Sequence, residues 1–170
     1  ISNSKSGKKD LSKLCKTRVV NIPSPSFISI ISKKKKKNRK ILKLIAVGRL
    51  NKEKGYITII KALHNLQIKN FTMQILGDGP EKKKLKNLIS ALHLEKKIKL
   101  IGFKKNTTEY YDKSDLFINA SFFEGFPNAV VEAINHNIPV ICSNCRGGMN
   151  EILLNGKGGD LFPVNDFVEL

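Results

Sequence analysis

Short apolar runs alternate along most of this chain with segments in which apolar residues recur at helical spacing. Five runs have the composition of strands buried on both faces: residues 41–47, 71–76, 98–101, 116–119 and 138–142. Helical spacing links Ile57, Ile60, Leu63 and Leu66 after the first run, and Leu85, Leu88, Ile89 and Leu92 after the second. Later helices are expected near residues 107–111 and from Pro127, and residues 160–163 hint at a further strand. The alternation predicts β-α-β units, an α/β fold with a parallel sheet covered on both faces.

Glycine or serine follows four of the predicted strands, at the end where a parallel sheet binds its ligands. These residues are Gly48, Gly77, Gly102 and Ser121. We expect them to rim one crevice, because the carboxyl ends of parallel strands meet at one edge of the sheet.

Most of the positive charge lies in the first 40 residues. The net charge is +17, of which residues 1–40 supply +12. The folded part is therefore only mildly basic, and no aromatic residues interleave the lysines of residues 33–37 to stack on bases, so no nucleic-acid partner is expected. Three interpretations of residues 33–37 stay open: a solvated linker, attraction to anionic lipid headgroups, and a compositional bias.

The rest of the composition narrows the setting. A chain of 170 residues, 41% hydrophobic, can bury one core. No run reaches the eighteen or so apolar residues of a membrane span, and no secretory pattern follows Ile1. Cys142 and Cys145 form a Cys-x-x-Cys spacing, but no second pair or histidine at ligand spacing accompanies them, so we expect neither a zinc site nor a redox pair. We expect a cytoplasmic protein, peripheral at the inner face of the membrane if the lysine run binds lipid.

Two carboxylates flank a predicted helix start. Glu124 comes just before Pro127, which suits the first position of a helix, and Glu132 lies inside that helix. The N–H groups of Asn128 and Ala129 would then be free to bind an anion. Glu132 lies one turn beyond Asn128, about 6 Å along the axis, which approximates the separation of a phosphate and a ribose. One helix could hold a nucleoside diphosphate and its sugar, although an amphipathic helix with a solvated glutamate has the same pattern.

Six pieces of sequence recur in the order of a known family: Val47-Gly48-Arg49-Leu50 with Glu53-Lys54-Gly55, Gly77-Asp78-Gly79-Pro80, Glu124-Gly125-Phe126, Glu132-Ala133, Ile138-Pro139-Val140, and Gly147-Gly148 with Glu151-Ile152. Together, over residues 41–163, they resemble the carboxy-terminal half of a retaining glycosyltransferase of family 4, from the glycosyl transferases group 1. The resemblance implies a GT-B enzyme with two Rossmann-like domains, in which the second domain binds the nucleotide sugar.

The resemblance also implies roles for single residues. Arg49 and Lys54 match the basic pair on the donor diphosphate, Glu132 matches the glutamate that binds the ribose hydroxyls, and Glu124 matches the catalytic carboxylate beside the transferred sugar. The other implied donor-binding residues are Gly48, Gly102, Phe103, Lys104, Gly125, Phe126, Asn128 and Ala129. Asp112 and Asp115 are separated by two residues, so no Asp-x-Asp is present, and we expect no metal and no cofactor.

By the same resemblance, residues 1–40 are an interdomain segment and a remnant of the amino-terminal domain with a Lys-rich linker. Residues 41–170 are the nucleotide-sugar-binding domain, truncated at its carboxyl end. The expected partners are a nucleotide sugar, a saccharide or lipid-linked acceptor, and the missing amino-terminal domain, without which the fragment would be inactive. The alternatives are a non-catalytic nucleotide-sugar or polyanion-binding module and, third, a nucleic-acid-binding protein. The sugar, the base, the acceptor and the oligomeric state stay open.

Overall fold

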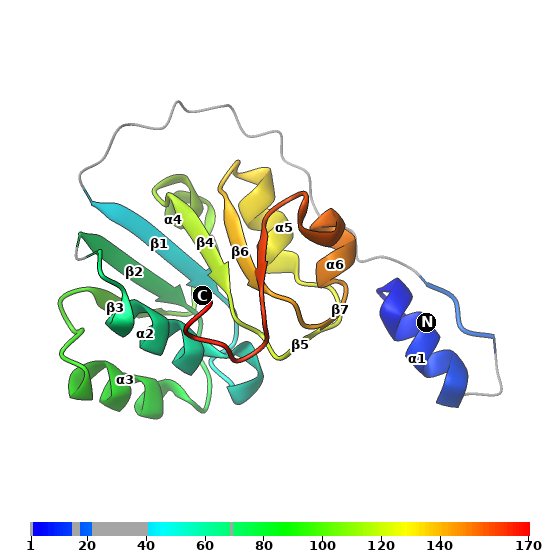
Figure 1. The fold of residues 1–170 in the computed structure, drawn as a ribbon, viewed down its shortest axis with the longest axis horizontal. Coiled ribbons are helices and arrows are strands. Elements are labelled where there is room, and N and C mark those ends of the chain that lie inside the picture. The colour runs from blue at the N-terminus through cyan, green and yellow to red at the C-terminus, as the bar shows by residue number, and fades with distance from the viewer. Residues whose placement is uncertain (1, 15–17, 22–40, 69) are drawn as a thin grey trace.

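A parallel six-stranded sheet forms the centre of the computed structural model of the chain, which describes residues 2–14, 18–21, 41–68 and 70–170 (Figure 1). The strand order is β3-β2-β1-β4-β6-β8. The strands are β1 (Leu42–Val47), β2 (Phe71–Leu76), β3 (Ile98–Gly102), β4 (Leu116–Asn119), β6 (Val140–Ser143) and β8 (Asp160–Phe162). The predicted α/β class with a parallel, Rossmann-like sheet is confirmed, and the hint of a strand at residues 160–163 is confirmed as β8.

Helices cover both faces of this sheet (Figure 1). One face carries α2 (Tyr56–Asn65) and α3 (Lys82–Ala91), and the other carries α4 (Thr108–Asp112), α5 (Asn128–Asn135) and α6 (Met149–Ile152). Two short 3-10 turns, η1 (Lys52–Lys54) and η2 (Leu154–Gly156), complete these connections. The β1 sequence shows why two layers are needed, because its side chains alternate between two cores. Leu44 and Ala46 are buried against α2, whereas Ile45 is buried against the opposite layer.

The chain reverses its direction of travel across the sheet between β3 and β4. From β1 it builds outward through β2 to the edge strand β3, and it then returns to place β4 on the other side of β1. Leu44 of β1 pairs with Leu116 of β4 in this central step. The gap beyond the carboxyl ends of β1 and β4 is therefore a topological switch point, where sheets of this kind bind ligands.

A second, two-stranded parallel sheet was not predicted from the sequence. It pairs β5 (Phe123–Glu124) with β7 (Arg146–Gly147). The close approach of the two strands requires glycine at position 147, where φ is +117° and a Cβ would lie 1.4 Å from the carbonyl oxygen of Glu124. This small sheet fixes the backbone of Glu124 beside the switch point.

The amino-terminal residues contain a helix, α1 (Lys5–Leu14), that the sequence did not lead us to expect. Residues 18–21 contribute only an isolated bridge, between Ser2 and Asn21, to the described part of this segment. The Lys-rich linker and the lysine run at 33–37 lie outside the described residues, so the domain boundary stays a prediction. No helix within the described ranges is long and apolar enough to cross a membrane.

Candidate functional site

The carboxyl ends of β1, β2 and β3 lie side by side, as predicted. The N–H of Gly48 donates to the carbonyl oxygen of Leu76 at 3.0 Å, and the N–H of Gly77 donates to that of Gly102 at 2.9 Å. Gly48 and Gly77 both line a cavity of about 400 Å³. Ser121 lies on the other side of β1, where it lines a smaller hollow together with Lys54. The predicted rim therefore spans both sides of the switch point.

The 400 Å³ cavity combines cationic, aromatic and apolar walls. Its lining residues are Val47, Gly48, Arg49, Leu76, Gly77, Asp78, Phe103, Lys104 and Thr107. Phe103 is 74% exposed, which is unusual for a large aromatic side chain in a folded domain. An exposed ring can stack on a planar base, and the neighbouring Arg49 and Lys104 can bind phosphate oxygens. The structure thus brings together four residues of the predicted donor site, Gly48 among them.

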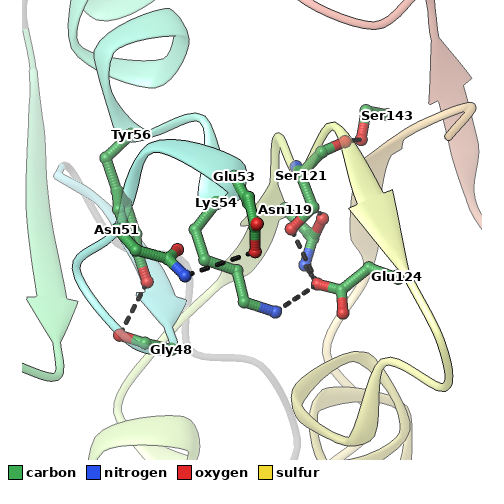
Figure 2. Close-up of polar contacts among 9 residues, drawn as sticks. All are labelled: Gly48, Asn51, Glu53, Lys54, Tyr56, Asn119, Ser121, Glu124 and Ser143. Atoms are coloured by element: carbon green, nitrogen blue, oxygen red, sulfur yellow. Dashed lines mark hydrogen bonds and ion pairs between the residues drawn. The ribbon is translucent and has the colours of Figure 1, made fainter.

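Lys54 and Glu124 are in direct contact across the switch point, although 70 residues separate them in sequence (Figure 2). The Nζ atom of Lys54 lies 2.6 Å from Oε1 of Glu124. The glutamate side chain is only 8% exposed and that of the lysine is 26% exposed. A carboxylate this deeply buried needs a compensating charge and donors, and Lys54 supplies the charge.

Two further side chains donate to the same carboxylate oxygen, as Figure 2 shows. The Ser121 hydroxyl donates to Oε1 at 2.7 Å, and the Asn119 amide donates to it at 3.3 Å. The Asn119 oxygen in turn accepts the backbone N–H of Ser121 at 3.0 Å. Together with Lys54 these groups fix the orientation of the Glu124 carboxylate, which is the condition for an electrostatic group to act without reorganising.

The backbone around Gly55 brings Lys54 to this position. Gly55 ends η1 with φ +63°, and a Cβ at this residue would lie 2.0 Å from the carbonyl oxygen of Ala120. Only glycine allows so close an approach in the left-handed conformation. The backbone of Glu53 also accepts a hydrogen bond from the N–H of Phe122 at 2.7 Å. The loop after β1 and the loop after β4 are therefore joined directly on each side of Lys54.

Tyr56 stabilises the backbone at the carboxyl end of β1 through a hydrogen bond. Its hydroxyl donates to the carbonyl oxygen of Gly48 at 2.9 Å (Figure 2). Burial, with a further contribution from the charge of Glu124, raises the pKa of Tyr56 above its ordinary value. The hydroxyl therefore keeps its proton at neutral pH and remains a donor to the turn that carries Arg49.

The start of α5 differs from the prediction. Pro127 caps the helix with ψ +80° and is not its first helical residue. The N–H of Asn128 donates to the carbonyl oxygen of Phe126 at 2.9 Å, so the expectation that this N–H is free for an anion is wrong. The cause is a tight turn at Pro127, which folds the chain back on Phe126. Gly125 and Phe126 lie between Glu124 and Pro127, and Ala129 lies in the first turn of α5; their donor-binding role stays a prediction.

Glu132 lies on the exposed side of α5, in a hydrogen-bond network of its own. Its Oε2 atom accepts a hydrogen bond from the hydroxyl of Tyr111 at 2.9 Å. The hydrogen bonds and ion pairs of the described residues do not connect this network to that of Lys54 and Glu124. The two carboxylates of the predicted motif are thus held separately, as groups that bind different parts of a ligand would be.

Three supporting residues were missed from the sequence: Asn119, Tyr56 and Tyr111. Asn119 carried a readable signal, because it is a polar residue at the carboxyl end of an apolar strand. The two tyrosines carried none, since a buried aromatic residue in a helix fits an ordinary core equally well.

Two other features lie apart from this site. A cavity of about 530 Å³ opens on the α2 face of the sheet, lined mainly by apolar residues such as Leu63, Ile118 and Ile141, and it holds none of the predicted site residues. Within the described ranges no three His, Cys, Asp or Glu side chains gather where they could hold a metal ion. The expectation of a metal-free site stays a prediction.

The fold and site define a Rossmann-like domain with cationic side chains and a buried carboxylate at its switch point. The family model described as glycosyl transferases group 1 matches residues 27–170. The chain therefore belongs to the glycosyl transferases group 1.

Curated relatives agree with this assignment. The chain is 35% identical over 123 residues to the N-acetylgalactosamine-N,N'-diacetylbacillosaminyl-diphospho-undecaprenol 4-alpha-N-acetylgalactosaminyltransferase of Campylobacter jejuni, covering 72% of this chain and 33% of that protein. It is 33% identical over 115 residues to the amylovoran biosynthesis glycosyltransferase AmsD of Erwinia amylovora, covering 68% and 33%. The chain spans 27% to 43% of the length of four such relatives.

Solved structures share the fold. Anabaena HepE in complex with UDP and glucose superposes with a TM-score of 0.86 at 22% identity, over 99% of this chain and 50% of that one. HepE in complex with UDP-glucose gives a TM-score of 0.70 at 26% identity, over 75% and 36%. These neighbours are GT-B glycosyltransferases, as predicted for this chain.

Proposed function

We propose that this chain is the donor-binding part of a retaining family-4 hexosyltransferase, which transfers a sugar from a nucleotide-diphosphate sugar to a saccharide or lipid-linked acceptor. The contact between Lys54 and Glu124 carries the proposal. A cation suited to a phosphate and a carboxylate suited to a sugar hydroxyl lie 2.6 Å apart at the switch point. A nucleotide sugar presents a phosphate next to a hydroxyl-bearing sugar ring, and the bond between the phosphate and the anomeric carbon of that ring is the one that breaks.

Each charged residue then has a distinct task. Arg49 and Lys54 offset the negative charge that grows on the leaving diphosphate. Glu124 accepts a hydrogen bond from a hydroxyl of the transferred sugar and stabilises the positive charge that develops at the oxocarbenium-like carbon. In the free chain Lys54 is paired with Glu124, and on donor binding it is shared between the carboxylate and the phosphate.

The donor and acceptor classes are supported by the relatives. HepE is solved with UDP-glucose, and the 400 Å³ cavity beside Phe103 has room for a base, so we propose a UDP-sugar donor. The Campylobacter relative is named for a diphospho-undecaprenol acceptor and the Erwinia relative for amylovoran biosynthesis. These names favour a role in cell-surface polysaccharide or glycolipid synthesis.

Calorimetry of this chain with UDP in excess chelator tests the proposal. Since Arg49 and Lys54 neutralise the diphosphate, binding should need no divalent metal. Lys54→Ala should weaken binding by about 1.5 to 3 kcal/mol, the range for a hydrogen bond to a charged group. Lys52→Ala is the matched control, because Lys52 lies in the same 3-10 turn but is exposed and lines a different hollow. Binding that requires magnesium or manganese would contradict the metal-free site.

Transfer itself should need more than this chain. The acceptor site and the wall that excludes water belong, in our proposal, to an amino-terminal GT-B domain. The chain should bind UDP yet transfer almost nothing, and joining it to the upstream domain should restore turnover. A non-catalytic nucleotide-sugar or polyanion-binding module, the alternative, would gain no transferase activity from that domain.

Contact with the inner face of the membrane is a separate part of the proposal. Residues 33–37 are five successive lysines, each worth about 1 kcal/mol near an anionic lipid surface. Sedimentation of the full-length protein with phosphatidylserine vesicles should fall when these residues are replaced by serine. Equal binding by both forms would show that the lysine run does not contribute to membrane binding.

A further inference from the structure

Tyr111 is buried at the centre of the layer formed by α4, α5 and α6. It has no exposed surface, and its ring stacks on that of His136 with 5.0 Å between the ring centroids. On another side it packs against Phe117 of β4 at 6.1 Å. These contacts hold the ring between the sheet and α5, so the direction of its hydroxyl is fixed by packing.

The hydroxyl of Tyr111 points at the first turns of α5. It donates to Oε2 of Glu132 at 2.9 Å and lies 3.2 Å from the carbonyl oxygen of Ala129. A phenol carries one proton, so the two acceptors share it. The stronger acceptor is the carboxylate, because it is charged.

Glu132 itself is an exposed residue. An exposed glutamate has several rotatable bonds and samples many orientations, and fixing it on a ligand costs conformational entropy. Tyr111 removes much of this freedom beforehand, since one carboxylate oxygen is already anchored to a rigid, buried ring.

From this geometry we infer that Tyr111 is a positioning residue for the nucleotide ribose: it holds Oε2 of Glu132 so that the carboxylate presents its other oxygen to the ribose hydroxyls. The inference rests on the proposed function, in which Glu132 binds the ribose. Tyr111 does not touch the ligand and acts through Glu132 alone.

The protonation state of Tyr111 suits this task. Burial, followed by the charge and the hydrogen bond of Glu132, raises the pKa of the Tyr111 phenol above its ordinary value. The hydroxyl therefore keeps its proton and remains a donor at neutral and mildly alkaline pH. The anchor does not switch off at neutral or mildly alkaline pH.

A comparison of two nucleotides separates positioning from a general structural role. Calorimetry of this chain measures the dissociation constants of UDP and of 2′,3′-dideoxyuridine diphosphate, which lacks the ribose hydroxyls. Tyr111→Phe should weaken UDP about tenfold, the order expected for loss of one hydrogen bond to a charged group. It should change the dissociation constant of the dideoxy nucleotide by no more than about twofold, because the rest of the site is unchanged. Phe fills the same space, so the core should stay packed.

Two variants complete the design. Tyr110→Phe is the matched control, because it removes the neighbouring phenol, whereas the hydroxyl bound to Glu132 in the described residues is that of Tyr111; it should change neither dissociation constant. In a Glu132→Ala background, Tyr111→Phe should have no further effect on UDP, since its only route to the ribose is gone.

The outcomes are distinct. Loss of UDP affinity with unchanged dideoxy affinity supports the positioning role. Equal loss for both nucleotides, or no loss for either, overturns it while leaving the proposed function intact. Failure of the unmodified chain to bind UDP at all would contradict the proposed function, and the positioning role with it.

Discussion

The carboxylate of Glu151, in α6, accepts hydrogen bonds from the backbone N–H of Lys5 at 2.7 Å and from that of Ser6 at 3.2 Å. A side chain distant in sequence therefore caps the first turn of α1. The hydroxyl of Ser4 accepts the next N–H, that of Gly7, at 3.0 Å. The three N–H groups at the start of α1 therefore all have acceptors, and a negative charge lies at the positive end of the helix.

This cap has a consequence for the site. With α1 fixed to α6, the side chain of Asn3 lies against Gly125, which follows Glu124 directly. The amino-terminal segment thus borders the loop that we assign to the transferred sugar, although about 120 residues of sequence separate them.

We predict that Glu151→Ala loosens α1 without unfolding the domain. Loss of a helix cap costs about 1 kcal/mol, which corresponds to roughly fivefold faster exchange of the capped amides. Hydrogen exchange of the backbone amides of Lys5 and Ser6 measures this directly. Glu151→Gln keeps an oxygen acceptor and should lose less, and Glu109→Ala, which removes an exposed carboxylate paired with Lys113, should leave these amides unchanged. Equal exchange in all four proteins would show that the cap does not hold α1 in solution.

Gly55→Ala should destabilise the domain by about 2 to 4 kcal/mol. Alanine is strained in the left-handed conformation of this residue, and its Cβ would clash with a carbonyl oxygen. The nearest atom is the oxygen of Ala120 at 2.0 Å. Urea denaturation gives the free energy of unfolding. Gly158→Ala is the control, because its Cβ would meet no atom closer than 3.4 Å. Similar losses for the two variants would mean that the joined loops do not depend on glycine.

The repeat of strands and helices could be predicted because it is written locally in each segment. The pattern at residues 71–76 and 116–119 predicts β2 and β4 with their observed bounds, since a short, mostly apolar run that ends near turn-forming residues is typical of a buried strand. The helix α1 could not be predicted this way. Its sequence is mostly polar, and within the described residues it is fixed by Glu151, a partner that no local pattern reveals.

Only part of the candidate site could be predicted from local sequence patterns. Strand ends and the Glu124 motif placed the main groups, because topology brings strand ends together. The turn at Asn128 depends on how Pro127 folds back on Phe126, and the Lys54 contact depends on the approach of two loops at Gly55. Such close backbone approaches are set by the whole fold, so the sequence near each residue does not show them.

The Cys-x-x-Cys pair should be chemically inert in the folded chain. Both thiols are buried; burial, with the neighbouring thiol, raises the pKa of Cys142 to about 12, and burial also raises the pKa of Cys145. Iodoacetamide at pH 8 should modify them only after unfolding in urea, because the thiolate is the reactive form. Rapid modification of either thiol in the folded chain would contradict this.

The same shift makes stability fall at alkaline pH. The unfolded thiol ionises near pH 8.5, whereas folded Cys142 keeps its proton, so stability is full below about pH 8.5 and is lost as the pH rises. Between pH 7.5 and 9.5 the free energy of unfolding should fall by about 1.3 kcal/mol more in the unmodified chain than in Cys142→Ala. Parallel pH profiles for the two proteins would show that the thiol does not contribute.

The last prediction separates the two carboxylates. Glu124→Gln keeps a hydrogen-bonding shape, so in the full-length enzyme it should leave UDP affinity within a few tenths of a kcal/mol. It removes a charge that matters mainly as the glycosidic bond breaks, and such preorganised groups are worth on the order of a hundredfold or more in turnover. Glu132→Ala should instead lower affinity for UDP and for the UDP-sugar alike. Single-turnover rates and nucleotide affinities, measured together, distinguish these roles from a purely structural role of both glutamates, in which neither substitution would change the rate or the affinity. A Glu124→Gln enzyme that keeps more than about a third of the rate would remove Glu124 from the catalytic step, because a group needed in the transition state cannot be neutralised at so small a cost.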